Sequence, residues 1–270
     1  STNNAHISVE TYYRYLNQKL LPIYDKVLYL DSDIIINGDI AKLYNIDLQG
    51  KLLGAVRDID FLGNLNVKHG KRMNYAKTVL KMQNPYDYFQ AGVLVLNTKA
   101  MREHYTIEQW LAYASNDDFI YNDQDVLNAH CEGNVLYLPW EWNVVHDCGG
   151  RMDNLFTQSP NDIYDAYMQS RSNPQIIHYA GYQKPWADPD CDYASIYWRY
   201  ARETPFYERL IKRVVLANEP QIPEDAFLPK LERAVGEDNP IRKFIDPLMP
   251  IGSRRRDALK AIARVARGRR

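Results

Sequence analysis

Cysteine is scarce in this sequence, and long apolar runs are missing. The three cysteines, Cys131, Cys148 and Cys191, are odd in number and lack the close pairing of a zinc site. We therefore expect reduced thiols and a cytoplasmic protein. No stretch approaches the ~20 consecutive apolar residues that a membrane-spanning helix needs. A disulfide-rich secreted domain and a membrane-spanning protein are both disfavoured.

A net charge of one sign is also missing, since 33 basic and 34 acidic residues leave a formal net charge of −1. The chain as a whole is therefore not predicted to bind nucleic acid. Positive charge instead gathers in residues 254–270, where eight basic residues accompany a single acid, Asp257. Apolar residues of this tail form a stripe, which predicts a helix on an anionic membrane surface, at the inner face of the membrane. A solvated basic tail is the alternative.

Phenylalanine is rare and tyrosine is abundant, with 7 Phe beside 21 Tyr. Tyrosine joins a flat apolar face to a polar tip, which suits a wet, sugar-sized cleft. A tyrosine-rich core is the simpler explanation of the same composition. The remaining composition is ordinary, with 46% hydrophobic and 25% charged residues in 270, enough to bury a sizeable core.

Continuous apolar runs alternate with amphipathic stretches through residues 1–204. Such runs are typical of strands buried on both faces. Strands are predicted at 26–30, 34–36, 52–56, 91–97, 134–138 and 175–180, and helices at 9–21, 70–83, 98–114 and 123–130. The alternation predicts an α/β fold with a mostly parallel sheet flanked by helices. After this main domain we expect an irregular helical C-terminal region, made of a proline-rich extension at 205–253 and then the basic tail.

The acids Asp31 and Asp33 come directly after the first apolar run, with Ser32 between them. In open α/β sheets, ligands gather at the carboxyl ends of strands. Two carboxylates separated by one residue can bind one hard cation, Mg²⁺ or Mn²⁺, which takes further ligands from substrate phosphates. Without a cation, two adjacent ionised acids repel each other. An acid-rich turn after a strand is common, so this motif alone leaves both interpretations open.

His178 lies in another apolar run and is followed by Gly181 and Lys184. A single histidine in an apolar strand is usually a core residue. Here a nearby glycine permits close backbone approach, and a lysine suits phosphate, so the cluster favours a metal-ligand role. Imidazole combined with two carboxylates suits Mn²⁺ better than Mg²⁺.

Asp123, Gln124 and Asp125 stand at the predicted start of a helix. Acids at this position stabilise a helix by roughly 0.3–1 kcal/mol, which is a sufficient structural explanation. An amide between two acids could instead bind sugar hydroxyls on one side and a reacting centre on the other. The motif alone does not decide between these interpretations.

Four segments, in this order along the chain, resemble glycosyltransferase family 8: DKVLYLDSDIIINGDI, YFQAGVLVLN, NDQDVLN and IIHYAGYQKPW. The resemblance runs from about Ile7 to Trp186. It implies a GT-A (Rossmann-like) fold with a mixed sheet, a UDP-sugar donor, Mn²⁺ and retention of anomeric configuration. The family includes lipopolysaccharide galactosyl- and glucosyltransferases and glycogenin relatives. The resemblance therefore also implies transfer of a hexose to a saccharide or glycolipid acceptor, such as lipopolysaccharide or another cell-surface glycan.

The resemblance further implies roles for individual residues. Asp31, Asp33 and His178 match metal ligands. Asp123 and Gln124 match contacts to the donor sugar, with Gln124 nearest its reacting face. Other contacts to the donor sugar or its diphosphate are implied at Arg14, Asp58, Gln90, Ala91, Gly92, Gly181 and Lys184.

Retention raises the question of how the leaving diphosphate is displaced from the donor sugar. A double displacement needs a nucleophile on the face opposite the leaving group. Gln124 is a poor nucleophile, and Asp125, the third catalytic candidate beside Asp123, would have to reach the sugar. A same-face substitution, with the departing phosphate as base, fits these residues better.

Two departures from the family pattern leave other functions open. Gln90 stands where the family usually has asparagine, which affects sugar choice or local geometry. The family also begins with a nucleotide-binding strand-helix-strand, a unit of roughly 30 residues, and we expect this sequence to lack that part. The rival functions are a non-catalytic binding protein with the GT-A fold and another metal-dependent sugar-nucleotide enzyme.

Overall fold

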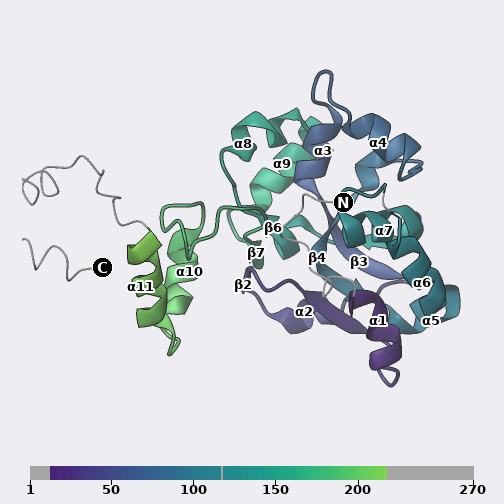
Figure 1. The fold of residues 1–270 in the computed structure, drawn as a ribbon, viewed down its shortest axis with the longest axis horizontal. Coiled ribbons are helices and arrows are strands. Elements are labelled where there is room, and N and C mark those ends of the chain that lie inside the picture. The colour runs from purple at the N-terminus through teal and green to yellow at the C-terminus, as the bar shows by residue number, and fades with distance from the viewer. Residues whose placement is uncertain (1–12, 117, 218–270) are drawn as a thin grey trace, which may run out of the picture. The chain divides into compact units, whose positions relative to one another are not determined.

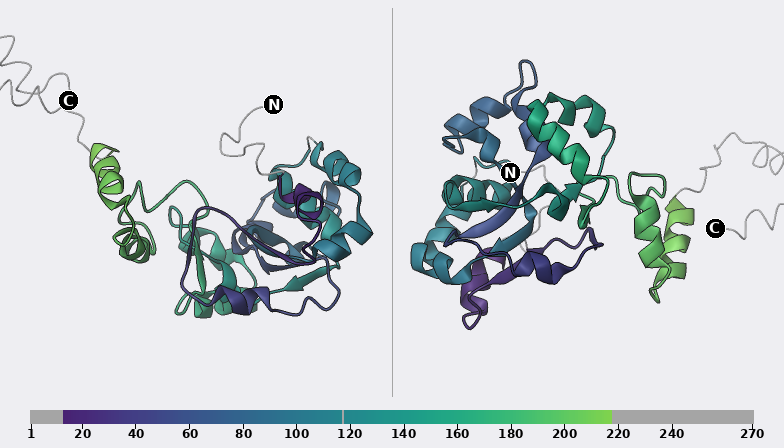
Figure 2. Two further views of the ribbon diagram at one scale, coloured as in Figure 1. Left: turned by 90° about the horizontal axis from the view of Figure 1, so that it is seen from below. Right: turned by 180° about the vertical axis from the view of Figure 1, so that it is seen from behind.

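The computed structural model of the chain describes residues 13–116 and 118–217 (Figures 1 and 2). Most of the predicted proline-rich extension and the whole basic tail, 254–270, lie outside the described residues. Within the described part, no helix is long and apolar enough to cross a bilayer.

A four-stranded sheet carries most of the core, in the order β1-β4-β3-β5. Its strands are β1 (Val27–Leu30), β3 (Leu53–Arg57), β4 (Phe89–Leu96) and β5 (Val135–Tyr137). β4 is antiparallel to both of its neighbours, whereas β3 and β5 are parallel. Nearly all residues of β3 and β4 are buried, as their apolar runs predict. β1 is only half-buried, since it is an edge strand among the described strands.

A second sheet has three short strands in the order β2-β7-β6. They are β2 (Ile34–Ile36), β6 (Val144–Val145) and β7 (Ile176–His178). β7 is antiparallel to β2 and parallel to β6. The register pairs His178 with Ile34, the residue after Asp33. This pairing brings the end of β7 to the turn between β1 and β2.

The sheets are mixed, as the family resemblance implied, but the predicted excess of parallel pairing is wrong. Of the five strand pairings among the described residues, three are antiparallel and two are parallel. A continuous apolar run reports burial on both faces and carries no information about strand direction. β4 is buried on both faces while antiparallel to its neighbours, which is why the usual association with parallel sheets misled the prediction.

Helices surround the sheets in Figure 1. The described α-helices are α1 (Tyr13–Leu20), α2 (Ile40–Tyr44), α3 (Ile59–Leu65), α4 (Arg72–Thr78), α5 (Thr98–His104), α6 (Ile107–Ala114), α7 (Asn122–Cys131), α8 (Arg151–Asn154), α9 (Asn161–Ser170), α10 (Ala194–Ala201) and α11 (Tyr207–Ala217). The described 3₁₀ helices are η2 (Pro85–Asp87), η3 (Trp140–Asn143) and η4 (Phe156–Gln158).

One helix prediction needs correction. The single helix predicted at 98–114 is two helices, because Thr106 starts a new one through a reciprocal capping box with Gln109. At the start of the extension 205–253, α11 forms, which agrees with the expected irregular helical C-terminal region.

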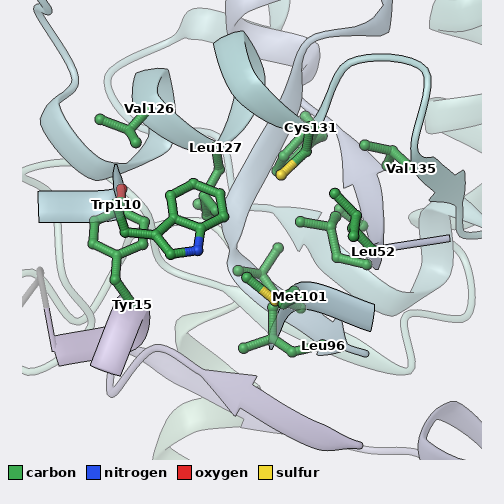
Figure 3. Close-up of a cluster of buried hydrophobic side chains, with 14 residues drawn as sticks. Tyr15, Leu52, Leu96, Met101, Trp110, Val126, Leu127, Cys131 and Val135 are labelled. Atoms are coloured by element: carbon green, nitrogen blue, oxygen red, sulfur yellow. The ribbon is translucent and has the colours of Figure 1, made fainter. Parts of the chain in front are cut away.

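A buried cluster fixes α1 against α6 and the start of α7. The rings of Tyr15 and Trp110 stack with centroids 5.2 Å apart, and Figure 3 shows them beside Val126 and Leu127 of α7. The Tyr15 hydroxyl donates to the backbone carbonyl of Asp123, at 2.8 Å. α1 and the N-terminus of α7 are therefore held together at the place where the functional residues gather.

Several of the many tyrosines belong to the core, since Tyr15, Tyr88, Tyr167 and Tyr179 are at most 1% exposed. The tyrosine-rich core therefore accounts for part of the composition. The three cysteines are buried and form no disulfide, which agrees with the expected reduced thiols.

Candidate active site

A cleft of about 1030 Å³ opens where β1 ends, β4 begins and α7 starts. This volume is at the upper end of the range for small-molecule sites. Ten of the thirteen predicted site residues line the cleft, namely Arg14, Asp31, Asp33, Gln90, Ala91, Gly92, Asp123, Gln124, Gly181 and Lys184. The other three, Asp58, Asp125 and His178, are buried, with exposures of 8%, 0% and 1%.

The three predicted metal ligands converge in the cleft wall. Nε2 of His178 lies 3.3 Å from Oδ1 of Asp33 and 3.7 Å from Oδ2 of Asp31. One ligand atom from each residue lies within 4.8 Å of the other two, and no other such group of three was found among the described residues. The antiparallel register of β2 and β7 causes this convergence, because it places His178 opposite Ile34. Two carboxylate oxygens and one imidazole nitrogen fit a divalent ion such as Mn²⁺.

Gly92 makes room for this convergence. A Cβ at this position would overlap Cε1 of His178 and lie 2.7 Å from Oδ2 of Asp31. The Gly92 carbonyl also accepts the backbone N–H of Asp31, at 2.8 Å. The glycine is therefore needed for close approach between β4 and two of the metal-ligand candidates.

Cationic and hydroxyl groups surround the two acids. Nζ of Lys184 donates to Oδ2 of Asp33 and to the carbonyl of Tyr179, both at 2.6 Å. The Tyr29 hydroxyl donates to Oδ1 of Asp31, at 2.8 Å. Burial alone would raise the pKa of Asp33, but the neighbouring imidazole of His178 and the ammonium of Lys184 hold that pKa well below its usual range. Asp33 is therefore ionised at neutral pH and available to a cation.

Arg14 joins the metal-ligand candidates to the start of α7. Its guanidinium pairs with Oδ2 of Asp123 at 2.6 Å, donates to the Ala91 carbonyl at 2.9 Å and to the Tyr29 hydroxyl at 2.8 Å. The arginine is 7% exposed, so its charge is only weakly screened by water. It supplies fixed positive charge beside Asp31, whose Oδ1 lies 3.6 Å away.

The Gln124 amide has a fixed orientation in the cleft wall. Its oxygen accepts the backbone N–H of Ala91, at 2.9 Å. Its nitrogen donates to Oδ2 of Asp58 at 2.9 Å and to the Tyr88 hydroxyl at 3.2 Å. The backbone donor at Ala91 determines which end of the amide carries the oxygen.

Asp125 does not face the cleft, which contradicts its place among the catalytic candidates. Its carboxylate accepts the hydroxyls of Tyr75 at 2.6 Å and Tyr88 at 2.7 Å, and the backbone N–H of Tyr121 at 2.6 Å. Three donors and complete burial leave it no access to a sugar. Asp125 instead anchors the first turn of α7, which positions Gln124.

Two acids near Gln124 are buried, which disfavours their ionised forms. Burial raises the pKa of Asp58 to about 6, and the neighbouring Asp60 carboxylate adds to the rise. Burial likewise raises the pKa of Asp123 to about 6, against the effect of the Arg14 guanidinium. Asp58 also caps α3, since its Oδ1 accepts the N–H of Phe61 at 3.0 Å. Its carboxylate therefore links α3 to Gln124.

The raised pKa of Asp58 predicts a measurable pH dependence of stability. Its reference pKa is 3.8, so the folded chain binds the proton more tightly than the unfolded chain, and ionisation opposes folding as the pH rises. Between pH 7 and pH 5, the free energy of unfolding of the wild type should increase by about 1 kcal/mol more than that of Asp58→Asn. Urea denaturation at the two pH values measures this difference. An equal change in both proteins would contradict it.

Some residues of the site were missed by sequence reasoning. Tyr29 could have been found, because it lies two residues before Asp31 and strand side chains alternate between faces. Tyr182 and Trp186 line the cleft from within the quoted segment IIHYAGYQKPW. Asn143 contacts His178 but lies in no quoted motif.

Comparisons with known proteins show the family of the chain. The sequence model of the family described as glycosyl transferase family 8 matches residues 1–190. A lipopolysaccharide 1,2-glucosyltransferase of Escherichia coli K12 is 28% identical over 181 residues, which cover 65% of this chain and 48% of that protein. Glycosyltransferase GlyF of Streptococcus pneumoniae is 29% identical over 187 residues, which cover 67% of this chain and 38% of GlyF. The chain thus spans half or less of the length of these two relatives.

Solved structures share the fold. The apo structure of the bifunctional glycosyltransferase WbbM is 32% identical with a TM-score of 0.71, covering 78% of this chain and 38% of that one. The galactosyltransferase LgtC, solved with donor and acceptor sugar analogues, is 26% identical with a TM-score of 0.55. The match covers 82% of this chain and 72% of LgtC. The expected GT-A fold is confirmed by these neighbours. Together with the matched family model, they show that the chain belongs to glycosyl transferase family 8.

Proposed function

We propose that this chain moves a hexose from a UDP-sugar to a saccharide acceptor, with retention of anomeric configuration. The acceptor we propose is lipopolysaccharide or another cell-surface glycan, because the relatives include a lipopolysaccharide 1,2-glucosyltransferase. The observation that carries the proposal is the convergence of the buried His178 with Asp31 and Asp33, which line one large cleft. Membership of family 8 supports the same reaction class.

Asp31, Asp33 and His178 would hold a Mn²⁺ ion. When bound, the ion would offset the negative charge that develops on the departing diphosphate. Lys184 and Arg14 place two further positive charges in the cleft, at 2.6 Å from Asp33 and 3.6 Å from Asp31. Fixed charge of this kind needs no reorganisation during the reaction, which makes it effective in catalysis.

Retention is best explained by a same-face substitution. Asp125 is buried in the first turn of α7, and the Gln124 amide is held by three hydrogen bonds. Asp123, the third candidate, is paired with Arg14 at 2.6 Å. None of the three is placed as a free nucleophile, which leaves the departing phosphate as the base for the acceptor hydroxyl. A covalent glycosyl adduct trapped on Asp123 or Asp125 would refute this mechanism.

The natural full-length protein allows a direct test of the proposed reaction. UDP-glucose, UDP-galactose and UDP-N-acetylglucosamine are offered with and without Mn²⁺, and the nucleotide product is identified. We expect Mn²⁺-dependent release of UDP from one donor. With added pyrophosphate, formation of UTP and a sugar 1-phosphate would indicate a sugar nucleotidyltransferase, and absence of turnover with bound donor would indicate a non-catalytic binding protein.

We also propose that residues 254–270 attach the enzyme to the inner face of the membrane, where a glycolipid acceptor would be available. Eight basic residues and an apolar stripe in this tail support an interaction with anionic lipid. Deleting residues 254–270 should abolish binding to vesicles that contain anionic lipid and leave activity on a soluble acceptor unchanged. Vesicle flotation measures the first effect, and unchanged flotation would contradict the proposal.

A further inference from the structure

Asn143 connects the predicted metal ligand His178 to Gln90. The asparagine ends η3 and is 2% exposed. One end of its side chain lies 3.1 Å from Nδ1 of His178, and the other end donates to Oε1 of Gln90 at 2.8 Å. Both ends of a buried amide are thus engaged, one of them by a candidate metal ligand.

The direction of this hydrogen-bond chain follows from its first donor, the backbone N–H of Gly92. This N–H lies 2.5 Å from the Gln90 side chain, so the atom that accepts it is the oxygen. The Asn143 atom that meets the same oxygen must then be its NH₂ nitrogen. The Asn143 oxygen is left to face His178, and because it can only accept, Nδ1 of His178 must carry a proton.

A proton on Nδ1 makes Nε2 the ring nitrogen that can bind a metal ion. Nε2 is also the nitrogen that faces the two acids, at 3.3 Å from Asp33 and 3.7 Å from Asp31. The ring cannot shift easily, because Cε1 lies over Gly92 on one side and the Asn143 oxygen meets Nδ1 on another. Ring orientation and tautomer are therefore set by the same contacts.

We propose that Asn143 is a positioning residue that fixes the tautomer and orientation of His178 for metal binding. A neutral amide suits this task, because Asp31, Asp33 and Asp123 already bring three carboxylates to the cleft. A fourth acid beside His178 would increase their mutual repulsion. The proposal rests on the proposed function for the identity of the metal, while the Nδ1 proton can be observed without any metal.

Asn143→Leu keeps the size of the side chain and removes the acceptor. Loss of such an outer partner typically weakens metal binding by about 10–100-fold, and we expect the dissociation constant for Mn²⁺ to rise by that factor. Electron paramagnetic resonance of free Mn²⁺ measures it. In ¹H–¹⁵N NMR spectra of the metal-free protein, the wild type should show a protected Nδ1–H proton of His178, and this signal should be lost in Asn143→Leu.

Two further variants separate positioning from general stability. Asn143→Asp keeps an acceptor and should retain the Nδ1–H signal, shifted downfield because a carboxylate accepts more strongly. Tyr167→Phe removes a buried hydrogen bond of 2.6 Å from the Tyr167 hydroxyl to the Val145 carbonyl. Val145 lies in β6, the strand that pairs with β7 and therefore with His178. It should lower stability without changing Mn²⁺ affinity or the His178 signal.

The proposal is overturned if Asn143→Leu keeps both the wild-type affinity and the Nδ1–H signal. If Asn143→Leu does not fold, an unshifted signal in Asn143→Asp overturns it equally. A wild-type protein that binds no Mn²⁺ would refute the proposed function. The Nδ1–H signal of metal-free wild type and Asn143→Asp would still decide the role of Asn143 in that case.

Discussion

Asp33→Asn is expected to lower Mn²⁺-dependent turnover by roughly 10³-fold while the chain remains folded. Asparagine keeps the shape of the side chain but removes the charge that attracts the ion. Metal-ion stabilisation of a transition state contributes several kcal/mol, and each ~1.4 kcal/mol is a factor of ten in rate. The Asp33 side chain is 23% exposed, so folding does not depend strongly on it. Steady-state kinetics and Mn²⁺ titration measure the two effects.

Lys184→Met is the matched control, because it breaks the same ion pair from the other side. Lys184 meets Asp33 at 2.6 Å, so an incoming ion competes with its ammonium for the carboxylate. Without Lys184, Mn²⁺ alone should bind at least as tightly as in the wild type, whereas affinity for the UDP-sugar should fall. Ser32→Ala, between the two acids, should change neither.

Asp33→Asn should therefore weaken Mn²⁺ binding, whereas Lys184→Met should not. Equal weakening by Asp33→Asn and Lys184→Met would mean that the ion pair itself, and not a carboxylate ligand, matters for the site. The assignment of Asp33 as a metal ligand would then be wrong. Normal Mn²⁺-dependent turnover of Asp33→Asn would contradict it more directly.

Much of the cleft could be predicted from sequence because its residues lie in short motifs that end strands or begin helices. Asp31 and Asp33 follow β1 directly, and Gln124 starts α7. Such positions carry local signals, since strand ends and helix starts have characteristic residues. A metal-ligand role for His178 beside the two acids was favoured by the residues around it and implied by the family resemblance. Its physical cause is the register of β2 and β7, which no local pattern reveals.

The remaining features depend on distant contacts and were missed or wrong. Asp125 looked like Asp123 in sequence, yet two tyrosines from other parts of the chain enclose it. About half a turn of helix thus separates a residue in the cleft from one in the core. Asn143 reaches His178 only because η3 lies beside β7. Strand direction was also mistaken, since burial on both faces produces the same apolar run in either direction.

Gly92→Ala is expected to abolish measurable Mn²⁺ binding and to lower turnover by about 10²-fold or more. The added methyl group would overlap Cε1 of His178, and it would lie 2.7 Å from Oδ2 of Asp31 and 2.9 Å from Oε1 of Gln90. Two metal ligands and the residue that orients Asn143 must then move together. A displacement of about 1 Å near a reacting centre can cost 10²-fold in rate. Mn²⁺ titration and steady-state kinetics measure both effects.

Gly54→Ala provides a control with similar crowding in the adjacent strand β3. Its Cβ would lie 3.0 Å from Cδ2 of Leu48 and 3.2 Å from Cδ2 of Leu138, away from the metal ligands. Overpacking of this kind costs about 1–3 kcal/mol of stability, so both variants should unfold more easily. Only Gly92→Ala should lose Mn²⁺ binding. If both lose it, the metal site depends on general packing of the sheet; if neither does, His178 and Asp31 do not bind the ion together.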